Sequence, residues 1–85
     1  MGRALEAVRT LDLPRLFAYF GVEADLQRVE ASRPAIAARF DAEVRELVRL
    51  CPALRERERF TVLREALRLA YEVGTRTAEG AGAAR

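Results

Sequence analysis

The sequence predicts an all-α protein, a small antiparallel helical bundle with two short N-terminal helices and two long amphipathic helices. Apolar residues recur at intervals of three and four along most of the chain, which is the spacing of one helix face. Capping residues, prolines and a glycine divide this pattern into segments, and no stretch shows convincing strand alternation. The 85 residues fit one domain, which we expect over residues 1–75, followed by a disordered tail at residues 76–85.

The two short helices are expected in the first twenty residues. The segment GRALEAVRTL places Leu5, Val8 and Leu11 at helical spacing and predicts a short amphipathic helix. Asp12 then offers an N-cap, and Pro14 falls in the first turn of the next helix, where a missing N–H costs nothing.

The second short helix, LPRLFAYF, carries an aromatic cluster that we expect to form the core. Leu13, Leu16, Phe17 and Phe20 share one face of this helix. Burial of each large ring contributes about 1.5 to 3 kcal/mol. Gly21 follows the cluster and is typical of a helix C-terminus.

The first long helix is expected to begin after a connecting segment. Residues Glu23–Ala31 have weak periodicity, so we expect a loop or a single turn there. Ser32 is the expected N-cap, Pro34 falls early enough to be tolerated, and the helix should end before Pro52. The expected apolar stripe comprises Ile36, Phe40, Val44 or Ala37, Leu47 and Cys51.

The second long helix is expected to start near Ala53 and to face the first. Its opening charges alternate in sign at residues 55–59, which indicates a solvated face or, alternatively, a salt-sensitive partner contact. Beyond Val73 glycines and small residues predominate, and this composition predicts the disordered tail. The expected apolar stripe comprises Phe60, Leu63, Leu67, Ala70 and Tyr71.

The composition argues against an enzyme, a metal site or a cofactor. The chain has no His, and Cys51 is its only cysteine, so a structural zinc site within one chain is not expected. Ser32 has no His to activate it and is explained by helix capping. Cys51, at a helix end on the apolar stripe, is expected to be a small buried hydrophobe, with a redox sensor as the alternative.

The charge pattern argues against a nucleic-acid partner. The sequence pI is about 9.3, but the formal net charge is only +2 and acidic residues alternate with the arginines. Such mixing is typical of a solvated surface and not of a stripe that follows phosphates. The chain also has no signal peptide pattern and no long apolar run, so we expect a cytoplasmic protein with no membrane association.

Self-association is expected because the core is thin. Much of the hydrophobic content is alanine, which leaves few large side chains for two long amphipathic helices. A domain of this size buries only about two thirds of the surface that its unfolded chain exposes. We therefore expect a homo-dimer or a homo-trimer.

An ordered series of residues in this chain is similar to a known family. An aromatic helix ends in Phe-Gly-Val, an Asp follows three residues on, and an Arg eight residues further opens a helix with Ile and then Arg-Phe. A closing helix carries an aromatic, a run of Leu and Ala-Tyr. This series resembles the nitrogenase-stabilizing/protective protein NifW family, over roughly residues 11 to 73. The matching residues are Phe20, Gly21, Val22, Asp25, Arg33, Ile36, Arg39, Phe40, Phe60, Leu63, Leu67, Ala70 and Tyr71.

The chain also departs from that family. Members usually have a His where this chain has Ala35, and a Pro-Tyr pair where it has Glu23 and Ala24. Members commonly continue into a basic, aromatic tail, whereas this chain reads TAEGAGAAR. The chain is therefore expected to be NifW-like, with a divergent, shortened tail and weaker binding to nitrogenase if that tail contributes.

The resemblance implies a non-enzymatic accessory protein without a cofactor. Its partner would be the molybdenum–iron protein of nitrogenase, which it would protect or stabilise against oxygen damage during nitrogen fixation. Of the matching residues, Asp25, Arg33 and Arg39 are charged without a packing reason and are the candidates for partner contact. An internal ion pair of Asp25 with either arginine is the alternative. The matches expected to be structural are Phe17, Phe20, Gly21, Ile36, Phe40, Phe60, Leu63, Leu67 and Tyr71.

Two other functions share these features. A homo-oligomeric helical scaffold or adaptor with a different cytosolic client would need the same thin core and amphipathic helices. A small DNA-binding helical protein would need arginines clustered on one exposed helix face, and the interspersed acidic residues argue against it.

Overall fold

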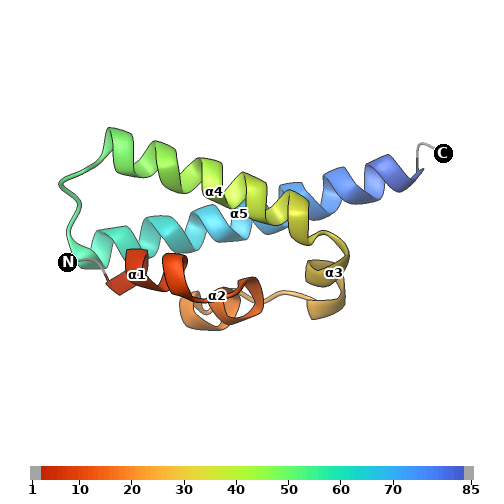
Figure 1. The fold of residues 1–85 in the computed structure, drawn as a ribbon, viewed down its shortest axis with the longest axis horizontal. Helices are drawn as coiled ribbons and strands as arrows, with labels where there is room; N and C mark the ends of the chain where they lie inside the picture. The colour runs from red at the N-terminus through yellow and green to blue at the C-terminus, as the bar shows by residue number, and fades with distance from the viewer. Residues whose placement is uncertain (1–2, 84–85) are drawn as a thin grey trace.

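The computed structural model describes the backbone of residues 3–83 and the side chains of residues 3–76, and all its regular structure is helical (Figure 1). The all-α prediction is therefore confirmed. The long axis of 45 Å follows α5, because 28 helical residues span about 42 Å. The five helices of this range are α1 (Arg3–Thr10), α2 (Leu13–Phe20), α3 (Leu26–Ala31), α4 (Arg33–Leu50) and α5 (Glu56–Ala83).

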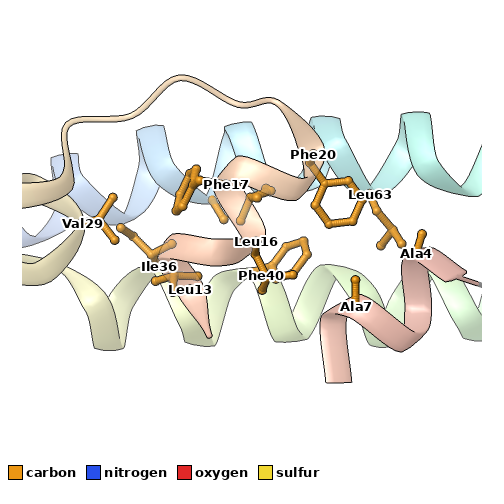
Figure 2. Close-up of a cluster of buried hydrophobic side chains, with 12 residues drawn as sticks. Ala4, Ala7, Leu13, Leu16, Phe17, Phe20, Val29, Ile36, Phe40 and Leu63 are labelled. Atoms are coloured by element: carbon orange, nitrogen blue, oxygen red, sulfur yellow. The ribbon is translucent and has the colours of Figure 1, made fainter. Parts of the chain in front are cut away.

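The core lies between the two long helices and the short helices that cover them. Helices α4 and α5 lie side by side, while α1, α2 and α3 each contact α5 (Figure 1). Figure 2 shows the aromatic side chains of α2 reaching into this space, with Val29 and Ile36 toward one end and Ala4 and Ala7 toward the other. The buried hydrophobic residues are Ala4, Ala7, Leu13, Leu16, Phe17, Phe20, Val29, Ile36, Phe40, Leu63, Leu67 and Ala70.

Helix α2 has the start and end that its sequence predicts. Asp12 accepts a hydrogen bond from the Arg15 N–H at 3.2 Å, and Pro14 lies in the first turn. Gly21 ends the helix in the left-handed region with φ of 68°, and the next N–H, of Val22, donates to the Phe17 carbonyl at 2.9 Å. The turn therefore needs a residue without a Cβ.

The rings of the α2 cluster do lie in the core, but two aromatic residues of the predicted α5 stripe are only partly buried. Phe17 and Phe20 are buried, whereas Phe60 and Tyr71 from α5 are partly exposed. The ring centroids of Phe20 and Phe60 are 5.1 Å apart, and those of Phe17 and Tyr71 are 5.6 Å apart in an edge-to-face contact. The aromatic cluster thus joins α2 to both halves of α5.

The segment expected to be a loop contains a helix, α3. Asp25 caps it by accepting hydrogen bonds from the N–H groups of Gln27 at 2.9 Å and Arg28 at 3.5 Å. Val29 is fully buried and Leu26 is 58% exposed, so Val29 is the one residue of α3 that lies in the core. Ser32 occupies the expected N-cap position of α4 but makes no capping hydrogen bond with its side chain, because the turn here also ends α3.

Helix α1 buries small residues instead of the large ones that the sequence pattern marked. Ala4 and Ala7 are buried, while Leu5, Val8 and Leu11 are only partly covered. The alanines lie one position before Leu5 and Val8, on the neighbouring face, and their small size lets α1 approach α5 closely. The larger side chains are left at the side of the helix.

The predicted burial of Cys51 is wrong. Its side chain is exposed, because the residue is the C-cap of α4 and has left helical geometry at φ of −132° and ψ of 62°. Its N–H still donates to the Leu47 carbonyl at 2.8 Å. The helical stripe therefore ends at Leu47 and does not continue to Cys51.

Helix α5 differs from its predicted extent at both ends. It begins at Glu56 and not near Ala53, and its backbone remains helical to Ala83 through most of the predicted tail. Residues 84 and 85 of that tail lie outside the described residues. Gly74 and Thr75, which the sequence assigned to the tail region, are buried. Packing of this turn of α5 against α4 extends the helix beyond the point where composition predicts its end.

No helix in the described part of the chain combines the length and the apolar character needed to cross a bilayer.

Candidate protein-binding surfaces

The three predicted contact residues make separate local contacts. Asp25 caps α3, as described above, Arg33 forms an ion pair with Glu30, and Arg39 lies 3.5 Å from the Glu43 carboxylate. Within residues 3–76, Asp25 pairs with neither arginine, so the predicted internal lock does not form. Both arginine side chains remain close to half exposed.

Asp25 instead connects α3 to α5 through its backbone. Its N–H donates to the Tyr71 hydroxyl at 3.1 Å, across 46 positions of sequence. The Arg28 guanidinium lies 5.9 Å from the centroid of the same ring. The carboxylate of Asp25 is thus occupied by the helix cap, and this residue has a structural explanation.

A first apolar hollow, which we call the arginine groove, lies between α1 and α4. It has a volume of about 330 Å³. Val48, one of its lining residues, is 49% exposed. A neighbouring hollow of about 340 Å³, which belongs to neither of the two surfaces named here, is also lined by Val8 and extends to Arg33. The groove is lined by Leu5, Val8, Val44 and Val48 and by Arg9, Arg45 and Arg49.

A second apolar hollow, which we call the acidic seam, lies between α4 and α5. Its volume is about 170 Å³. Leu50 is 62% exposed at its edge, and Val62 is 39% exposed. The seam is lined by Leu47, Leu50, Val62 and Ala66, with Glu43, Glu46 and Cys51.

The charged side chains around these two surfaces form exposed ion pairs within the chain. Arg45 lies 3.1 Å from Asp41, and Arg49 donates to both carboxylate oxygens of Glu46 at 2.8 and 3.0 Å. Exposed pairs of this kind contribute about 0 to 1 kcal/mol, so they leave the side chains available to a partner.

A further charged cluster on α5 perturbs one titrating group. Arg68 donates to Glu65 at 3.0 Å and to Glu72 at 2.6 Å. The hydrogen bond and charge of Glu65, with the charge of Glu72, raise the pKa of the Arg68 guanidinium above its ordinary value. The guanidinium therefore stays charged at any physiological pH.

Two structural residues were missed by sequence reasoning. Glu56 lies in the alternating run that was expected to be a solvated face. Its carboxylate accepts a hydrogen bond from the Ala4 N–H at 2.9 Å and so satisfies a free backbone donor in the first turn of α1. Its neighbour Arg59 is only 18% exposed and donates to the Leu54 carbonyl at 3.1 Å. Nothing in the alternation of charges distinguishes these residues from exposed ones.

Gly74 is a further structural residue that sequence reasoning missed. A Cβ built on it would lie 2.7 Å from Ile36 Cγ1 and 2.9 Å from the Ile36 nitrogen. Gly74 continues the three- and four-residue spacing of the buried residues Leu63, Leu67 and Ala70, and this spacing is the signal that could have marked it.

Among the described residues, no group of three or more carboxylate, thiol or imidazole side chains is placed to hold a metal ion. Comparison with known proteins finds no family model, no curated protein and no solved structure that matches this chain.

Proposed function

We propose that this chain is a non-enzymatic accessory protein that acts by binding other proteins, with the molybdenum–iron protein of nitrogenase as its client. The observation that supports a binding role is the apolar surface left uncovered on both sides of α4, in the arginine groove and the acidic seam. The identity of the client rests on the NifW resemblance alone. Protection against oxygen would then be steric, through coverage of a vulnerable surface of the client.

For the arrangement that carries this function we propose the antiparallel bundle expected from the sequence. Two contacts support it. Gly74, late in α5, lies against Ile36 at the start of α4, and Ala66, nearer the middle of α5, shares the acidic seam with Leu47, late in α4. We also propose that the protein is cytoplasmic, where a nitrogenase client would be met.

Self-association belongs to the same proposal. The exposed apolar side chains on the described surface include Val48, Leu50, Val62 and Leu69, which lie on the two longest helices. Contact with a second copy would remove some of this apolar area from water, at about 25 cal/mol for each Å².

The first test is size-exclusion chromatography with light scattering. The protein is measured alone and mixed with a molybdenum–iron protein, before and after exposure to air. Co-migration that increases after exposure, together with slower loss of nitrogenase activity, is the expected result. Absence of co-migration at micromolar concentrations in both states would exclude the nitrogenase client.

A homo-oligomeric scaffold with a different cytosolic client is the second candidate. The opposite charges of the two hollows favour it, because they suit contact between copies without any client. Self-association without co-migration in the same experiment would select this candidate.

A further inference from the structure

The last two turns of α4 carry one broad apolar stripe, whose residues line both hollows. Val44 and Val48 line the arginine groove, and Leu47 and Leu50 line the acidic seam. A helix on the surface of a globular protein normally has one apolar stripe facing the core. Val44 and Leu47 pack partly against the core, whereas Val48 is 49% exposed and Leu50 is 62% exposed at the edges of this stripe. The folded single chain leaves these two side chains uncovered.

The two hollows carry opposite charge. The arginine groove is lined by three arginines and no acidic residue, and the acidic seam by Glu43 and Glu46 and no basic residue. The chain as a whole has 15 basic and 13 acidic residues, interspersed along its length, so this separation is a local property of the fold. Surfaces that pair apolar centres with opposite charged edges are complementary.

We propose that the acidic seam of one copy seats in the arginine groove of a second copy. The proposal rests on the self-association proposed above and names the surfaces that form it. Leu50, the most exposed of the large hydrophobic residues, would insert toward Val48 and Val8 in the groove of the partner copy. Because the two surfaces differ, the contact is head-to-tail, and a pair of copies keeps one free groove and one free seam unless the assembly closes.

The charged side chains required for this contact can leave their ion pairs within the free chain at a small cost in free energy. Arg45 and Glu43 are engaged in the free chain with Asp41 and Arg39, through exposed ion pairs. Arg49 of the groove pairs with Glu46 of the seam in the same exposed manner, so this pair must also open when the contact forms. Arg9 lies on the groove without an ion pair among the described residues. Replacing weak ion pairs within a copy by ion pairs between copies changes the free energy little. Burial of the apolar side chains of the two surfaces then drives association.

Complementation of two variants tests the contact. Val48→Glu places a carboxylate in the groove, and Leu50→Arg places a cation in the seam; both positions are exposed, so the fold should persist. Each variant alone should associate about tenfold or more weakly than the parent chain. An equimolar mixture should form a complex of two chains, about twice 9.5 kDa by light scattering, because one intact groove and one intact seam remain.

A matched control and a charge exchange complete the design. Leu26→Glu changes an equally exposed apolar residue of α3 that belongs to neither surface, and it should associate like the parent. Arg45→Glu and Glu43→Arg should each weaken association, and the double variant should restore it, since the charges are then complementary again. Helical circular dichroism confirms that each variant is folded.

Three results would overturn the proposal. They are a monomeric parent across the micromolar range, parent-like association of both Val48→Glu and Leu50→Arg, and failure of the folded mixture to form the two-chain complex. Binding to the molybdenum–iron protein is measured separately with the same variants. If the molybdenum–iron protein binds a parent chain that is monomeric, this contact is refuted, and the proposed binding function is retained.

Discussion

Substitution of Gly74 tests how closely α5 approaches α4. The Cβ of Gly74→Ala would lie 2.7 Å from Ile36 Cγ1, 2.9 Å from the Ile36 nitrogen and 3.0 Å from its Cα. Two of these atoms belong to the backbone, so rotation of the Ile36 side chain relieves only the first contact. The start of α4 and this turn of α5 must separate, and the packing around Ile36, which is fully buried, must loosen.

The size of the effect follows from two opposing contributions. Overpacking of a close contact costs about 1 to 3 kcal/mol. Replacement of glycine by alanine inside a helix stabilises by about 1 kcal/mol. We expect Gly74→Ala to lower the free energy of unfolding by about 1 kcal/mol, and Gly74→Val to lower it more, because valine adds volume and gains less helix propensity.

Urea denaturation followed by helical circular dichroism, at one fixed protein concentration, measures this change. For a domain of this size a loss of 1 kcal/mol lowers Tm by about 4 to 8 °C. Ile36→Ala supplies a double-mutant cycle, in which Gly74→Ala should cost less once the Ile36 side chain is absent. A Gly74→Ala protein as stable as the parent, or more stable, would refute the close approach.

Substitutions at four further positions test contacts described above. Asp25→Ala removes the α3 cap and should cost about 1 kcal/mol in urea denaturation, whereas Asp25→Asn should cost much less. Tyr71→Phe keeps the ring but leaves the Asp25 N–H without its acceptor, and a loss of about 0.5 to 1.5 kcal/mol is expected in the same assay; no loss would contradict the hydrogen bond. Glu56→Ala should release the Ala4 N–H and speed amide hydrogen exchange in α1 without affecting α4; unchanged exchange would show that this bond does not hold α1. Arg39→Glu should leave helicity intact and weaken binding to the molybdenum–iron protein, and loss of helical circular dichroism would instead assign Arg39 a structural role.

Periodicity and caps account for the parts of the fold that the sequence predicts. Asp12, Pro14 and Gly21 place α2 correctly, because each acts through local backbone geometry that needs no tertiary information. Pro52 likewise marks the end of α4 to within two residues. The buried residues Ile36, Phe40, Leu63 and Leu67 follow from spacing alone, since only one face of each long helix repeats large apolar residues.

The elements that were missed depend on neighbours distant in sequence. Helix α3 has one buried residue, Val29, and a six-residue helix offers too few repeats for periodicity to detect. On α1 the alanines and the larger residues lie on adjacent faces, and only the close approach to α5 decides which is buried. Helix α5 continues past Gly74 because tertiary packing there outweighs the low helix propensity of glycine.

The candidate surfaces were likewise beyond sequence reasoning. Asp25 was selected as a partner contact, but its side chain is explained as the N-cap of α3, which needs only the next three residues. The arginine groove forms because α1 leaves one side of α4 uncovered, which is a property of how three helices are arranged. Spacing along one helix places Val44 and Val48 on the same face, but it does not show which residues of other helices lie opposite them.

The use of alanines to attach α1 has a consequence for how the molecule opens. Two methyl groups remove little apolar area from water, and one long-range hydrogen bond, from Ala4 to Glu56, adds about 1 kcal/mol to the attachment. The α4–α5 pair, in contrast, buries Ile36, Leu63 and Leu67 completely. Leu5, Val8 and Leu11 add contacts that are only partly covered. Helix α1 is therefore held less firmly than the α4–α5 pair, and we expect it to detach in a local opening that leaves α4 and α5 folded. Since α1 is one wall of the arginine groove, the width of that groove changes when α1 opens. A partner bound in the groove would therefore slow amide hydrogen exchange in α1, although it contacts only one side of that helix.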